Sequence, residues 1–211
     1  MLGSWLDFFF ALTTWVALVF IFSFHNYLKA LTAVKLGDDT PRRYGYLTID
    51  PLVHIDPIGT VLIPFVLILF GSKLVIGWPR QVPLNYELFE RDKKKLIVLL
   101  SISILSYFAI ALVGLLLFHL VQILNLPRSI YLPLAGTFEG VYFIAAFFGF
   151  LNLIPIPPLD AGIILFLLLK KSYYEIHNIS FWGMIIVLLL FLSGLLDHLF
   201  RPIFNFLGTF L

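Results

Sequence analysis

The sequence predicts an all-α polytopic membrane protein. Of its 211 residues, 61% are hydrophobic, and the mean hydropathy is +1.01. Charged residues make up about a quarter of an ordinary soluble domain, but only 12% of this chain. The chain has no cysteine, which excludes disulfides and thiolate metal sites, and its net charge of +2 does not indicate nucleic-acid binding.

Five apolar stretches make up most of the chain: Leu6–Leu36, Ile58–Ile76, Leu96–Leu124, Val141–Leu169 and Ile179–Leu196. A membrane crossing needs about 20 apolar residues. The first and third stretches are long enough, and so is the fourth if surrounding protein accommodates its prolines. The second, broken by Pro64 and Gly71, is marginal. We expect one membrane domain over residues 1–211, with about 4–6 helices and its last helix or helices within 179–211. The N-terminus lacks the basic region of a cleaved signal peptide, so the first stretch should remain as a membrane helix.

The charges favour a re-entrant second stretch, which enters the membrane and returns to the same face. Arg128 and Arg201 then lie on one side, and eleven basic residues lie on the other: Lys35, Arg42, Arg43, Lys73, Arg80, Arg91, Lys93, Lys94, Lys95, Lys170 and Lys171. If the second stretch crosses, the split is nearer 8 to 5. The positive-inside rule therefore favours the re-entrant arrangement, with the N-terminus outside. Six ordinary crossings are the alternative.

Polar residues occur inside the first apolar stretch, at His25-Asn26-Tyr27-Leu28-Lys29. Polar groups within a membrane helix are costly and usually functional. Residues four apart share a helix face, so His25 and Lys29 point the same way. This is the layout of H-E-x-x-H, in which two histidines bind zinc and the glutamate is the general base. Here Asn26 replaces the glutamate and Lys29 replaces the second histidine.

The fourth apolar stretch is interrupted at Asn152-Leu153-Ile154-Pro155-Ile156-Pro157-Pro158-Leu159-Asp160-Ala161-Gly162. Prolines remove amide donors and clash with the preceding turn, so the helix must break there. An aspartate directly after such a break is typical of a site within a membrane protein. His25 lies 11 residues before Leu36, and Asp160 lies 10 before Lys170. Both are thus roughly 15 Å from a helix end, which predicts that they lie at a similar depth.

Together these motifs resemble the site-2 protease family of zinc intramembrane metalloproteases, especially its compact bacterial members. The similarity covers about residues 8–170 and includes the 152–162 stretch, which is similar to the family's N-x-x-P-x-P-x-L-D-G element. Supporting segments are 35–38, 47–60 and 77–85. The resemblance implies a site-2 protease-like core of transmembrane helices.

The resemblance also assigns positions at the chemical site. His25 matches the first zinc-binding histidine, and Asp160 matches the third zinc ligand. Asn26 occupies the place of the glutamate base, and Lys29 that of the second histidine ligand. Ser106 appears where the family usually has asparagine. A catalytic zinc needs three protein ligands and a base near its water, so the resemblance implies a degenerate H-E-x-x-H motif.

Three further polar residues are candidates for substrate binding by the same resemblance: His54, Asn85 and Asn152. A third zinc ligand from His54 is a weaker alternative. The segments Tyr44–Asp50 and Gln81–Asn85 have strand-like composition. Similar segments in the family form a sheet edge that receives an extended substrate by strand addition.

We expect Lys29 and Asp160 to form an ion pair in place of zinc, because each alone is an uncompensated buried charge. In the alternative, Lys29 extends along its stem to the membrane surface. The favoured function is a catalytically inactive relative, without cofactor, that binds transmembrane segments or an active membrane protease. The alternatives are an active zinc endopeptidase with unusual ligands and a small transporter or channel. We expect contact with membrane lipids but not nucleic acid, in the bacterial inner (cytoplasmic) membrane.

Overall fold

The computed structural model describes residues 5–70 and 77–211, and its described parts are helices and loops without a strand. Gly71 and Lys73 lie outside the described residues. The helices in chain order are α1 (Trp5–Lys35), α2 (Thr40–Arg43), α3 (Pro51–His54), the π-helix η1 (Pro57–Leu62), α4 (Ile63–Leu69), α5 (Tyr86–Arg91), α6 (Lys93–Ile123), α7 (Arg128–Leu151), α8 (Asp160–Leu168), α9 (Tyr173–Leu192) and α10 (Leu195–Gly208). The predicted all-α fold is confirmed.

Four helices in the described residues are long and apolar enough to cross a membrane: α1 from Leu12 onward, α6, α7 and α9. The second apolar stretch forms η1 and α4, which together run only from Pro57 to Leu69. At 1.5 Å per residue this segment is about 20 Å long, shorter than the roughly 30 Å hydrocarbon core. The four long apolar helices make the chain an integral membrane protein. The re-entrant arrangement of the second stretch, of which residues 71–76 lie outside the described part, stays a prediction.

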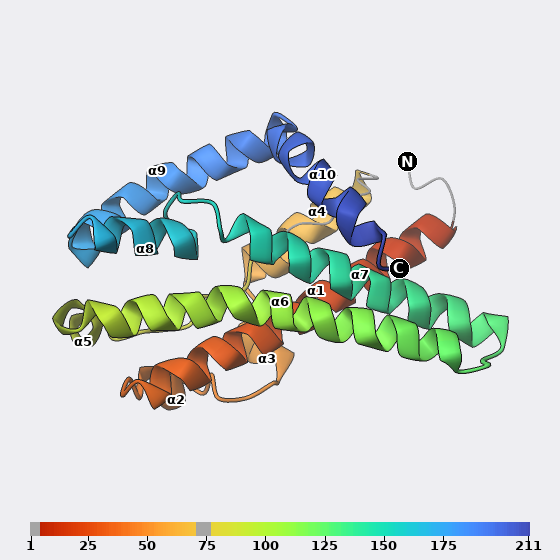
Figure 1. The fold of residues 1–211 in the computed structure, drawn as a ribbon, viewed down its shortest axis with the longest axis horizontal. Helices are drawn as coiled ribbons and strands as arrows, with labels where there is room; N and C mark the ends of the chain where they lie inside the picture. The colour runs from red at the N-terminus through yellow and green to blue at the C-terminus, as the bar shows by residue number, and fades with distance from the viewer. Residues whose placement is uncertain (1–4, 71–76) are drawn as a thin grey trace.

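The core is a three-helix contact among α1, α6 and α7, and Figure 1 shows α6 and α7 running side by side. Gly114 permits this close approach, since a Cβ there would lie 2.9 Å from the backbone nitrogen of Tyr142. Small residues bring membrane helices together in this way. Large buried side chains fill the space around the contact: Leu18, Ile21, Phe22, Tyr107, Tyr142 and Phe148.

The three prolines separate α7 from α8, as predicted. α7 ends at Leu151, the loop 153–159 follows with a cis Pro157-Pro158 bond, and α8 begins at Asp160. α9 packs on this loop through Gly183, whose missing side chain leaves room for the carbonyl oxygen of Pro157. The proline loop is thereby covered by a transmembrane helix, as an irregular backbone within a membrane requires.

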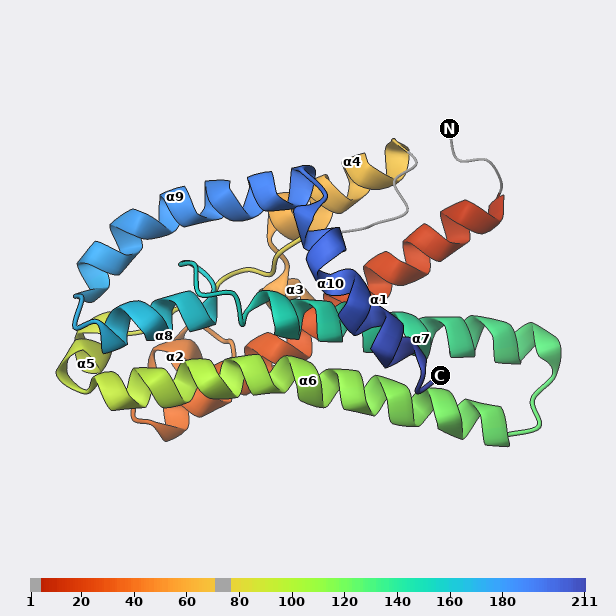
Figure 2. The same cartoon turned by 45° about the horizontal axis from the view of Figure 1, so that its top comes forward.

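The basic connections gather at one end of the molecule. Lys93 Nζ donates to the carbonyl of Lys171 at 2.9 Å, and the amide of Tyr173 donates to Glu90 Oε1 at 3.0 Å. Figure 2 shows α2 and α5 toward this end, while the start of α1 and the end of α10 lie toward the other. The placement of these connections on one face of the membrane, which the charge distribution favours, stays a prediction.

The aromatic-rich segment after α9 forms α10, which returns along α7. The rings of Phe147 and Phe200 lie 5.7 Å apart, and those of Phe143 and Phe204 lie 5.9 Å apart. Aromatic pairs at this spacing stabilise helix contacts beyond their buried area. With only 14 residues, from Leu195 to Gly208, α10 is too short to be a further crossing.

Candidate functional site

His25 lies at the centre of the bundle and is 4% exposed. Its Nδ1 is 2.8 Å from Ser106 Oγ, and its ring stacks on that of Tyr107 with centroids 3.9 Å apart. The Ser106 hydroxyl donates its only hydrogen to the carbonyl of Ser103 at 2.7 Å. His25 Nδ1 must therefore be the donor to Ser106. In the neutral imidazole this leaves the lone pair on Nε2.

Lys29 and Asp160 form an ion pair, with Nζ donating to Oδ1 at 3.1 Å. The lysine side chain is 17% exposed and the aspartate side chain 6% exposed. The pair predicted from the sequence is therefore present, and Lys29 does not extend to the membrane surface instead. The two motifs, 131 residues apart along the chain, meet at this contact.

Asn152 closes the proline loop and positions Asp160. Its side-chain oxygen accepts from the amide of Asp160 at 3.4 Å, and its carbonyl accepts from the amide of Ala161 at 3.0 Å. Its Nδ2 donates to the carbonyl of Phe148 at 2.9 Å, which anchors it to α7. The substrate-binding role assigned to Asn152 from the sequence stays a prediction, while its observed contacts hold the loop.

Asn26 is 2% exposed and directed to a different part of the molecule from Lys29. Its Nδ2 donates to the carbonyl of Arg80 at 2.7 Å. Arg80 belongs to the irregular segment 77–85, which joins the re-entrant part of the chain to α5. Asn26, which the resemblance assigns to the family's base position, therefore binds a loop of its own chain.

His54 is 1% exposed and lies on α3. Its Nε2 donates to the carbonyl of Thr48 at 2.8 Å, and its buried Nδ1 has no partner among the described residues. Burial lowers the pKa of His54, although the Thr48 carbonyl and Asp50 act in the opposite direction. Burial therefore favours the neutral imidazole. Its backbone carbonyl accepts from the amide of Arg80 at 2.8 Å.

Asn85 is a helix cap in this structure. Its side-chain oxygen accepts from the amide of Leu88 at 3.3 Å, at the start of α5. Its own amide donates to Asp38 Oδ2 at 2.8 Å, and this aspartate is 2% exposed. The bond ties the end of segment 77–85 to the end of α1. Substrate binding by Asn85 stays a prediction.

The residues that surround His25 carry little signal in the sequence. Ser106 departs from the family pattern, and no motif marks Tyr107. Both lie on α6, and their contacts with α1 depend on how the two helices pack. A polar residue within an apolar helix is the one signal that points to Ser106.

The arrangement does not fit a catalytic zinc ion. In the described ranges, 5–70 and 77–211, no group of three or more His, Cys, Asp or Glu side chains is placed to share a metal. His25 and Asp160 are two donors, and the Lys29 ammonium already holds the Asp160 carboxylate. An ammonium has no lone pair to give a metal and repels a divalent cation.

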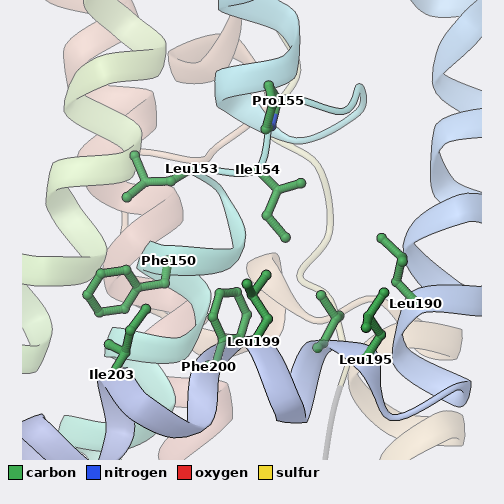
Figure 3. Close-up of a pocket in the computed structure, with 10 residues that line it drawn as sticks. Phe150, Leu153, Ile154, Pro155, Leu190, Leu195, Leu199, Phe200 and Ile203 are labelled. Atoms are coloured by element: carbon green, nitrogen blue, oxygen red, sulfur yellow. The ribbon is translucent and has the colours of Figure 1, made fainter.

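An apolar cavity of 390 Å³ lies between the proline loop, α9 and α10. Figure 3 shows Ile154 directed into the space between Leu190 and Leu195 on one side and Phe200 on the other. The lining side chains are aliphatic or aromatic, and none carries a polar atom. The cavity suits hydrocarbon and offers no group for catalysis.

The chain is similar to two curated bacterial proteins. It is 28% identical over 193 residues to "Putative zinc metalloprotease YwhC" of Bacillus subtilis (strain 168), a match that covers 90% of this chain and 84% of that protein. It is also 28% identical over 199 residues to "Putative zinc metalloprotease Rip2" of Mycolicibacterium smegmatis (strain ATCC 700084 / mc(2)155), covering 88% and 70% of the two chains. No protein-family model matches the chain, and no solved structure matches it. The resemblance to the site-2 protease family, drawn from the motifs, is confirmed: the chain is a homologue of proteins named as zinc metalloproteases.

Proposed function

We propose that this protein is a catalytically inactive homologue of zinc intramembrane metalloproteases that binds a segment of another membrane protein. The observation that carries the proposal is the Lys29–Asp160 ion pair. The resemblance assigns Lys29 to the position of the family's second histidine ligand, and the ion pair supports the proposal because an ammonium group cannot ligate zinc. The expected location is the bacterial cytoplasmic membrane, since both relatives are bacterial proteins.

The residues at positions 26 and 29 remove two separate contributions to peptide hydrolysis. Asn26 has no basic lone pair at neutral pH, so it cannot take a proton from water. A positioned general base contributes about 10²–10⁴-fold to the rate. Lys29 removes a metal ligand, and a bound zinc is what activates water in such enzymes. Loss of both leaves no route to an activated water.

Binding of an extended segment is supported by the edge of segment 77–85. Trp78 and Arg80 have their amides and carbonyls bonded to the body of the protein. Pro79, which lies between them, has no amide hydrogen. Gln81, which follows Arg80, is exposed and makes no backbone hydrogen bond within the described residues. A free amide and carbonyl on one side of an extended chain are what strand addition uses.

Metal content and peptide cleavage test the proposal together. Purified protein in nanodiscs should carry far less than one zinc per chain and should not cleave membrane-embedded peptides. The matched variant, Asn26→Glu with Lys29→His, restores a three-ligand set with His25 and Asp160, and should gain about one zinc per chain. Chelator-sensitive cleavage by the unaltered protein would overturn the proposal.

An active zinc enzyme with an unusual ligand set is the second candidate. It is favoured by the names of both relatives and by His25, whose Nδ1–H donates to Ser106 and leaves Nε2 for a metal. That candidate requires Lys29 to leave Asp160. It predicts zinc in the unaltered protein, so the same measurement separates the two.

A further inference from the structure

We propose that Asn26 is a positioning residue: its amide latches segment 77–85 onto α1 and so fixes the edge that the proposed function uses for binding. The inference rests on the proposed function only in assuming that this edge binds a partner segment. The latch itself depends on the juxtaposition of the Asn26 side chain with the Arg80 peptide.

The Arg80 peptide is held from two directions. Its carbonyl accepts from Asn26 Nδ2 on α1 at 2.7 Å, and its amide donates to the carbonyl of His54 on α3 at 2.8 Å. Two residues earlier, the amide of Trp78 donates to the carbonyl of Gly59 at 3.3 Å. The carbonyl of Trp78 accepts from Thr60 Oγ1 at 2.7 Å. Every backbone polar group of Trp78 and Arg80 is therefore bonded to the protein.

Only one of these four bonds reaches α1. Gly59 and Thr60 belong to η1, and His54 belongs to α3, so two of the other bonds join the segment to η1 and one joins it to α3. Within α1, Asn26 is the side chain that holds the Arg80 end of segment 77–85 to the helix bearing His25 and Lys29, while the bond from the Asn85 amide to Asp38 holds the other end just beyond α1. Without it, the segment is joined to η1 and α3 but loses this hydrogen bond to α1.

The latch requires an amide at position 26. Asn26 donates from Nδ2 to the carbonyl oxygen of Arg80. An ionised carboxylate at this position has no hydrogen to donate, and its oxygen would repel that carbonyl oxygen. Asn26 is 2% exposed, so water does not readily replace the lost partner. A buried acceptor left unsatisfied is destabilising. Asparagine at position 26, in place of the family's glutamate, therefore removes a general base and supplies the hydrogen bond that holds segment 77–85 to α1.

The consequence concerns Gln81. Trp78 and Arg80 are bonded inward, whereas Gln81 is exposed and its amide and carbonyl have no backbone partner within the described residues. Successive residues of an extended chain alternate in direction. A segment held to α1 presents this edge in one position, so less conformational entropy is lost when an extended partner binds.

Trypsin tests the latch directly, because the Arg80–Gln81 bond is a cleavage site within the segment. Purified full-length protein in nanodiscs is compared as the unaltered chain, Asn26→Ala, Asn26→Asp and a control, Asn205→Asp. The control makes the same chemical change at an exposed residue of α10. Cleavage after Arg80 should rise about fivefold in Asn26→Ala, the expected effect of losing a hydrogen bond of about 1 kcal/mol. It should rise further in Asn26→Asp and stay unchanged in Asn205→Asp.

Deuterium uptake across residues 77–85 is measured on the same samples and should follow the same order. If Asn26→Asp fails to fold, as seen by its thermal transition and elution profile, Asn26→Ala decides. Cleavage and deuterium uptake in Asn26→Ala equal to those of the unaltered chain would overturn the latch. Neither readout uses zinc or a partner, so a latch that opens as expected in a protein that proves to be an active protease would sink the proposed function and leave this inference standing.

Discussion

Lys29 and Asp160 place opposite charges inside the helix bundle, with side chains 17% and 6% exposed. Removal of one partner leaves the other as an unpaired buried charge, which typically costs about 3–5 kcal/mol. Lys29→Met and Asp160→Leu should each destabilise the protein by about that amount. The double variant should regain most of the loss, because apolar replacements of a buried pair are often neutral or stabilising. Denaturant or thermal unfolding in detergent measures the stability of the unaltered chain, the two single variants and the double variant.

The control for this cycle is the exposed pair of Asp197 and Arg201 on α10, with side chains 71% and 65% exposed. Exposed pairs are screened by water and contribute little. Arg201→Met should therefore leave stability nearly unchanged. Equal effects of Lys29→Met and Arg201→Met would contradict a buried, structurally important ion pair between Lys29 and Asp160.

Sequence reasoning at the residue scale succeeds where a single helix fixes the geometry. His25 and Lys29 share a face of α1 because they are four residues apart. The otherwise uncompensated buried charge of Lys29 predicts its partner, Asp160. The acceptor of Asn26 could not be predicted, because it is a backbone carbonyl, at Arg80, and any residue type supplies one. Backbone partners leave no signature in composition or spacing.

At the scale of elements, α9 meets the proline loop through Gly183. A Cβ at this residue would overlap the carbonyl oxygen of Pro157, and backbone on both sides limits any adjustment. Gly183→Ala should therefore destabilise the protein by about 1–3 kcal/mol, the usual cost of overpacking. Gly140→Ala is the matched control, since Gly140 lies within α7 and a Cβ there would have no neighbouring atom within 4 Å.

Gly140→Ala should be neutral or stabilising by about 0.5–1 kcal/mol, because alanine favours the helix. Thermal unfolding of both variants in the same detergent gives the comparison. A loss of stability in Gly140→Ala that matches Gly183→Ala would mean that α9 does not pack on the loop in the way the structure describes.

The elements themselves are predictable to different degrees. The three prolines place the break before Asp160, because proline cannot continue a helix. The strand-like composition of Tyr44–Asp50 and Gln81–Asn85 does not produce strands in the described residues. Side chains and carbonyls of neighbouring helices bond parts of these segments instead, and strand propensity depends on such surroundings.

The whole molecule depends on which side of the membrane each connection occupies. A re-entrant second stretch puts the connection after α1 and the start of α6 on one side, and the α6–α7 turn on the other. A crossing second stretch would separate the first two. Because the native chain has no cysteine, single cysteines at exposed positions report this directly, and the choice is Arg43→Cys, Lys94→Cys and Ser129→Cys.

In intact cells, a membrane-impermeant maleimide should label Ser129→Cys and leave Arg43→Cys and Lys94→Cys unlabelled until the cells are opened. The physical reason is the excess of Lys and Arg near the last two positions, which favours the cytoplasmic face. The described helical part of this stretch, η1 and α4, is about 20 Å long against a roughly 30 Å core, which also favours the re-entrant arrangement. Labelling of Arg43→Cys and Lys94→Cys from opposite sides of the membrane would mean that the second stretch crosses it. Such a crossing would contradict the hydrogen bond between the Asn85 amide and Asp38, which requires both residues on the same side.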